Sequence, residues 1–186
     1  MEAGSRVPLW LIGLLAILSA ATFAWSWFGF VQPFQAVAHQ SMLETRIGGY
    51  EAADVLAMYG TLQINPAARA LQLGLYVRAE LFFPAFFAAL LFLGLHRVQP
   101  GGNYFGRPLS PLAIRVFYAL PIAYTLADYA ENAAGFLAVT AAEPPMMLAQ
   151  ILPWLTRLKF LLITLSLITI LRFVLMPFRP GGQEED

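Results

Sequence analysis

The feature that most constrains this chain is a run without any charged residue that extends from Val7 to Val31. A helix needs about 20 apolar residues to cross the hydrocarbon core of a bilayer, so this run is long enough to span it. Comparable apolar stretches follow along the chain. Together they predict an all-α fold, an integral membrane four-helix bundle whose spans cover about residues 8–30, 70–95, 112–138 and 153–175.

The first apolar run has a second interpretation, as a cleaved signal peptide with Ser19, Ala20 and Ala21 at the cleavage site. The run continues well beyond that point, and Trp25 and Trp27 near its far end are typical of a membrane–water interface. We therefore expect the segment to be retained as a spanning helix.

The composition supports a membrane protein and excludes several kinds of site. Charged residues make up only 12% of the 186 residues, about half the usual share of a soluble domain. The net charge is zero and no basic patch is present, which argues against nucleic acid as a partner. The chain has no cysteine, and His39 and His96 fall on opposite sides of the predicted membrane. We therefore expect no metal centre and no cofactor.

Between the spans, the longest polar connection covers residues 32–65 and should form a small helical cap outside the membrane. Ser41 and Glu44 have the spacing of a capping box, and residues 50–59 repeat apolar side chains as a short amphipathic helix does. Asn65 followed by Pro66 is typical of a helix start. A Pro/Gly-rich linker covers residues 97–111, and the polar tail at 177–186 is expected to be disordered.

The distribution of arginine predicts the orientation, because loops rich in Lys and Arg stay in the cytoplasm. Two arginines, Arg46 and Arg69, lie on the side of the cap. The opposite side carries six: Arg6, Arg97, Arg107, Arg115, Arg172 and Arg179. Both termini and the linker should therefore be cytoplasmic, and we expect the membrane to be the inner (cytoplasmic) membrane of a bacterium.

The third span contains the most unusual polar group of the chain. Asp128, Glu131 and Asn132 follow one another at i, i+3 and i+4, so a helix places them on one stripe. Tyr124 lies one turn earlier and can donate its hydroxyl to Asp128. Acids at this depth are costly in lipid, so we expect them to face the inside of the bundle, where they have partners.

Three basic and three acidic residues are predicted to share this depth. At 1.5 Å per residue, Glu80, Asp128 and Lys159 fall roughly 20–26 Å above the cytoplasmic arginines, in the outer leaflet. Arg78, Glu131 and Arg157 come slightly higher. Because the six formal charges cancel, the pattern favours a buried ion-pair network. Two alternatives remain open: arginine and lysine side chains that extend to the interface, and a ligand or reaction site.

The sequence therefore favours a small polytopic membrane protein that is not an enzyme and that binds a lipid or a partner membrane protein. The alternative is a lipid-modifying enzyme or a small proton- or cation-coupled transporter that uses Asp128 and Glu131, since close carboxylates titrate as a coupled pair. A cavity of ligand size that reaches these acids would favour binding or chemistry over a purely structural role.

The predicted orientation can be measured directly because the chain has no cysteine. We expect Asn103→Cys to resist a membrane-impermeant thiol reagent in intact cells and to react once the cells are opened. Ile64→Cys, on the predicted outer side, is the matched control and should react in intact cells. Labelling of Asn103→Cys in intact cells would reverse the orientation.

Overall fold

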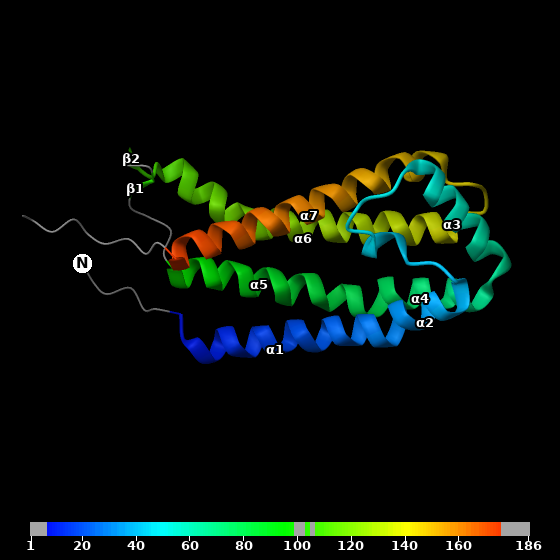
Figure 1. Ribbon diagram of the computed structural model, residues 1–186, viewed down its shortest axis with the longest axis horizontal. Coiled ribbons are helices and arrows are strands. Elements are labelled where there is room, and N and C mark those ends of the chain that lie inside the picture. The colour runs from blue at the N-terminus through cyan, green and yellow to red at the C-terminus, as the bar shows by residue number, and fades with distance from the viewer. Residues whose placement is uncertain (1–6, 99–102, 105–106, 176–186) are drawn as a thin grey trace, which may run out of the picture.

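The computed structural model describes residues 7–98, 103–104 and 107–175, and four helical rods run side by side through most of its length (Figure 1). The elements, in chain order, are α1 (Leu9–Ser26), the π-helix η1 (Trp27–Val31), α2 (Gln32–Ala38), the 3₁₀ turn η2 (Leu43–Thr45), α3 (Ala52–Ile64), α4 (Pro66–Gly74), the π-helix η3 (Leu75–Ala79), α5 (Glu80–Val98), the short antiparallel strands β1 (Asn103–Tyr104) and β2 (Arg107–Pro108), α6 (Pro111–Thr140) and α7 (Met146–Leu175).

The first rod is one continuous helix, Leu9–Ala38, formed by α1, η1 and α2. The prediction that the chain leaves the helix near residue 31 is wrong, because α2 continues it to Ala38. Phe34 explains the extension: it is fully buried in the cluster that α2 forms with α4, so tertiary packing favours further helix. The rod ends at His39, whose φ of 53° is left-handed.

The second rod runs from Pro66 to Val98 through α4, η3 and α5. The predicted start is confirmed: the Asn65 side chain accepts a hydrogen bond of 3.0 Å from the backbone N–H of Ala68. At 33 residues this rod is about 50 Å long, which is more than a helix perpendicular to the membrane needs to cross the hydrocarbon core.

The third and fourth rods are α6 and α7, each of 30 residues. The fourth helix begins at Met146, whereas its start was predicted near residue 153. Pro153 does not begin the helix but lies inside it. A proline removes one backbone hydrogen bond but does not prevent a helix whose neighbours hold it. Leu152 and Pro153 are both buried, and α3 packs against this part of α7.

Three of the rods are long and apolar enough to cross a membrane: Leu9–Ala38, Pro66–Val98 and Met146–Leu175. These three helices indicate a membrane protein. Among the described residues α6 is as long as α7 but does not belong to this set. It carries Arg115, Asp128, Glu131 and Asn132, which make it more polar than the other rods.

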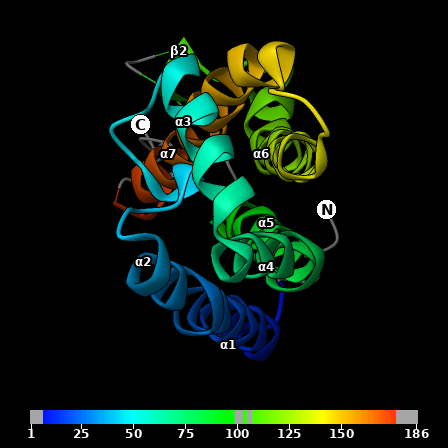
Figure 2. The same cartoon turned by 90° about the vertical axis from the view of Figure 1, so that its right-hand side faces the viewer.

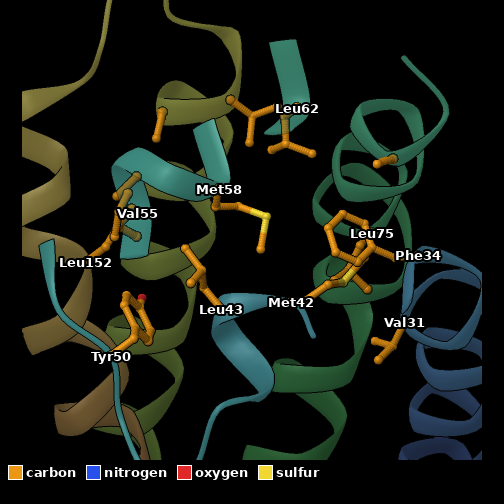
Figure 3. Close-up of a cluster of buried hydrophobic side chains, with 14 of the residues drawn as sticks. Val31, Phe34, Met42, Leu43, Tyr50, Val55, Met58, Leu62, Leu75 and Leu152 are labelled. Carbon is orange, nitrogen blue, oxygen red and sulfur yellow. The ribbon is translucent and has the colours of Figure 1, made fainter. Parts of the chain in front are cut away.

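The segment 39–65 packs across one end of the rods instead of extending away from them (Figure 1). Ser41 and Glu44 do not form the predicted capping box, since only the three-residue turn η2 follows. The helix predicted at 50–59 is α3, Ala52–Ile64, and the backbone N–H of Glu51 donates to Asp54 there. Figure 3 shows the buried side chains that hold this end together: Val31, Phe34, Met42, Leu43, Tyr50, Val55, Met58, Leu62, Leu75 and Leu152.

The rods are packed in sequence, with α1 along α5, α5 along α6 and α6 along α7. Seen from the end that carries α3, α1 and α7 are separated, and the chain after α2 passes between them (Figure 2). The start of α1, the end of α5, the start of α6 and the end of α7 share the opposite end of the molecule (Figure 1). The predicted tail at 177–186 lies outside the described residues.

Gly135 lets the second and third rods approach closely, and this contact can be tested. A Cβ at this position would lie 2.5 Å from the Tyr76 hydroxyl oxygen and 2.6 Å from Cζ of the ring. We expect Gly135→Ala to lower thermal stability in detergent, since overpacking costs about 1–3 kcal/mol and exceeds the gain in helix propensity. Gly94→Ala is the matched control, because its Cβ would meet only Ile170 at an ordinary 3.6 Å.

Adding Tyr76→Ala to Gly135→Ala should remove the steric conflict, so the two changes together should cost less than their sum. Equal melting temperatures for Gly135→Ala and Gly94→Ala would contradict the close packing.

Candidate functional site

A cavity of about 220 Å³ lies among α1, α5, α6 and α7, beneath the segment that carries η2. Its polar lining residues are Ser26, Glu44, Thr45, Glu80, Tyr124, Asp128 and Lys159, and its apolar ones are Phe23, Trp27, Val31, Ile47, Leu75, Phe83, Phe160 and Ile163. Phe23, Trp27 and Ile47 are also exposed at the surface. The cavity is therefore bordered by exposed side chains of the first rod and of the segment after η2, on the side of the molecule where α1 and α7 lie apart (Figure 2).

Lys159 of α7 occupies the centre of the polar wall and contacts two carboxylates of α6. Its Nζ lies 3.0 Å from Asp128 Oδ1 and also pairs with Glu131 Oε2. All three residues are deeply buried, with exposures of 8% for Lys159, 1% for Asp128 and 2% for Glu131. Because Asp128 and Glu131 are one helical turn apart, one ammonium group can bridge both.

Hydroxyl groups extend this ion triad in two directions. Tyr124 donates to Asp128 Oδ2 over 3.3 Å, as its position one turn earlier in α6 suggests. On the other side, Thr156 donates to Glu131 Oε1, and the Tyr50 hydroxyl lies 2.8 Å from Thr156 Oγ1. The chain of contacts thus continues from the cavity to Tyr50, which lies just before α3.

Glu80 lies on the α5 wall of the cavity and has a different environment from Asp128. Ser26 of α1 donates to Glu80 Oε1 over 3.2 Å. Among the described residues, no lysine or arginine lies within ion-pair distance of Glu80. Ser26 immediately precedes η1 and Glu80 immediately follows η3, so the two π-helices of the fold meet at this hydrogen bond. π-Bulges are frequent at functional sites.

Glu44 is a further acid of the cavity, and it was missed in the sequence analysis. Its carboxylate accepts from Gln72 Nε2, which also donates to the Tyr76 hydroxyl. Burial raises the pKa of Glu44 to about 7 from its ordinary value of 4.5. The sequence offered no signal for this position, because it depends on how the segment after α2 folds back over the rods.

Arg78 and Arg157 do not join the acids, so the predicted charge balance is wrong. Arg78 is exposed on η3, and no ion pair of Arg78 occurs among the described residues. Arg157 is exposed too, pairs with Glu51 at 2.9 Å and lies over the Trp154 ring. Both arginines face away from the interior because a guanidinium group is costly to bury without a partner. Among the described residues, Lys159 is therefore the basic side chain that pairs with acids of the interior, and its partners are Asp128 and Glu131.

Asn132 completes the predicted stripe but faces another part of the molecule. Its side chain is buried, and its amide nitrogen has no hydrogen-bond partner among the described residues. It lines a second, shallower hollow between α5 and α6 together with Tyr129 and Glu80. Glu80 thus borders both hollows. Within the described residues, no group of three or more His, Asp or Glu side chains could hold a metal ion.

Comparison of the chain with known protein families, curated proteins and solved structures finds no match.

The role of Lys159 can be tested by removing its charge. Lys159→Met leaves Asp128 and Glu131 buried without a cation, so we expect a loss of stability on the order of 3–5 kcal/mol. Asp128→Asn with Glu131→Gln in the same chain should recover most of this loss, because the triad is then neutral throughout. Thermal unfolding in detergent measures each variant.

The exposed pair Arg157–Glu51 provides the matched control for this experiment. Neutralising both partners, as Arg157→Gln and Glu51→Gln, should show a coupling below about 1 kcal/mol, since water screens the pair. Additive losses for Lys159→Met and the two acid variants would mean that the three side chains do not act as one unit.

Proposed function

We propose that this chain is a multi-pass membrane protein with four spans, both termini in the cytoplasm and the α3 segment on the outer side. Three helices that can cross a membrane support the proposal, as does α6, which packs between α5 and α7. A helix flanked in this way can hold polar residues toward the protein interior. The arginine distribution supports the orientation and the assignment to a bacterial inner membrane.

Within this framework, the protein binds a lipid-like amphiphile and is not an enzyme. The observation that carries the proposal is the cavity lined by α1, α5, α6 and α7, which has aromatic walls and a charged interior and is bordered by the exposed side chains of Phe23, Trp27 and Ile47. In this proposal an apolar tail enters past these side chains from the bilayer. Small-molecule sites typically combine apolar walls with a few convergent polar groups, and this cavity has that composition.

Two features favour a ligand-binding role over a purely structural one. A structural ion pair is best served by close packing, whereas Asp128 and Lys159 border open volume. The two π-helices also distort both rods at the level of the cavity, and such a distortion is costly unless it has a use. A partner membrane protein remains an alternative occupant of the gap between α1 and α7.

Proton-coupled transport or lipid modification is the second candidate function. It is favoured by the connected chain Tyr50, Thr156, Glu131, Lys159, Asp128 and Tyr124, which links the α3 segment to the cavity. Lys159 weighs against it, because its ammonium group already pairs with one oxygen of each carboxylate. Proton flux into proteoliposomes that Glu131→Gln abolishes would favour this function.

Filling the cavity should test the binding proposal. We expect the purified wild-type protein to retain about one amphiphile per chain in native mass spectrometry after mild delipidation. Ile163→Trp places a large ring in the cavity wall and should abolish this retention. Ile168→Trp is the control on the same helix, at an exposed position outside the cavity, and should retain the ligand.

Equal retention by Ile163→Trp and Ile168→Trp would place any bound amphiphile elsewhere on the protein. A wild-type protein that releases every amphiphile at the first wash would contradict the proposal.

A further inference from the structure

Acidic side chains outnumber basic ones around the cavity, and this excess indicates the charge of the ligand. Glu44, Glu80 and Asp128 line the cavity, and Glu131 lies behind Lys159. Among the described acids, Lys159 pairs with Asp128 and Glu131, so its charge is already shared between two carboxylates. Glu80 and Glu44 have a hydroxyl and an amide as their hydrogen-bond donors, and no cation lies within ion-pair distance among the described residues.

A positively charged group of a ligand would correct this deficit. Carboxylates in a medium of low dielectric are stabilised strongly by a nearby cation, and an ammonium group can donate to more than one of them. Glu80 and Glu44 come from different elements but border the same open volume. A cation placed there would lie among acidic groups on several sides and would not compete with Lys159.

The remaining walls fit the rest of such a ligand. Phe23, Trp27, Phe83 and Phe160 line the cavity, and the rings of Phe23 and Phe83 lie 5.8 Å apart. Aromatic faces attract ammonium groups and also pack against hydrocarbon chains. The exposed rim formed by Phe23 and Trp27 is where a tail would pass into the bilayer.

We propose that the cavity binds an amphiphile with a positively charged amine headgroup, held by Glu80 and Glu44, with its hydrocarbon tail in the opening between α1 and α7. The inference rests on the proposed function and specifies the chemical class of its ligand. An anionic headgroup is excluded from the same position, since it would face Glu44, Glu80 and Asp128 and find Lys159 already paired.

Ligands with the same twelve-carbon tail separate the effect of charge from the effect of the tail. The purified full-length chain in a maltoside detergent is titrated at pH 8 with dodecylamine, dodecylphosphocholine, dodecanol and dodecanoate. We expect dodecylamine to bind at least tenfold more tightly than dodecanol, and dodecanoate to bind least. Dodecylphosphocholine distinguishes a zwitterionic lipid headgroup from a simple amine, and we expect it to bind more weakly than dodecylamine because of its phosphate.

Two variants assign the effect to the acids. Glu80→Gln and Glu44→Gln should each reduce the affinity for dodecylamine about tenfold and leave the affinity for dodecanol unchanged. Unchanged dodecanol binding also shows that the variant is folded. Glu143→Gln, an exposed acid in the turn before α7, is the control and should bind dodecylamine as the wild type does.

The outcomes separate this inference from the proposed function. If dodecanol or dodecanoate binds as tightly as dodecylamine, the amine headgroup is wrong and the amphiphile site stands. The same holds if dodecylphosphocholine binds most tightly of the four, because the ligand is then a zwitterionic lipid. If neither glutamine variant changes dodecylamine binding, Glu80 and Glu44 do not hold the headgroup. Failure of all four ligands to bind overturns both proposals.

Discussion

The bridge from Lys159 to Asp128 and Glu131 is the interaction on which the interior of this protein depends. Two carboxylates that lie one turn apart on α6 would repel each other and would be costly to bury. One ammonium group from α7 neutralises much of that cost and at the same time fixes the register between the two helices. The hydroxyls of Tyr124 and Thr156 each donate to the second oxygen of one carboxylate, so these buried polar groups form a specific contact between the rods.

Much of the fold follows from local rules that the sequence displays. Apolar stretches predict where the four long helices lie, and Asn65 with Pro66 predicts a helix start that the hydrogen bond to Ala68 confirms. Helical spacing placed Tyr124, Asp128 and Glu131 on one stripe. The two misplaced boundaries have different causes: burial of Phe34 continues the first helix into more polar residues, whereas the fourth helix starts before Pro153 because Leu152 and Pro153 are buried within it.

The candidate site was less predictable, because counting residues along a helix gives depth but not direction. Arg78 and Arg157 were expected near the depth of Lys159, yet they point outward, and Arg157 pairs with Glu51 on the surface. Glu44 comes from a connection whose path no periodicity determines. The interior therefore lacks the two arginines that were predicted there and contains one additional acid. Among the described residues, its four carboxylates outnumber the single ammonium group of Lys159, so the predicted charge balance is replaced by an excess of acids.

The open side of the bundle follows from how its first rod is held. α1 packs along α5, while α7 packs along α6, so the two outer rods are separated, and the segment with η2 passes between them. At the level of Ser26 and Glu80, both neighbouring rods contain a π-helix, which widens a helix locally and reorients the side chains that follow. Glu80 therefore borders the cavity instead of facing α1 alone. A carboxylate held by one hydroxyl at a distorted helix is free to accept another donor, which the paired Asp128 is not.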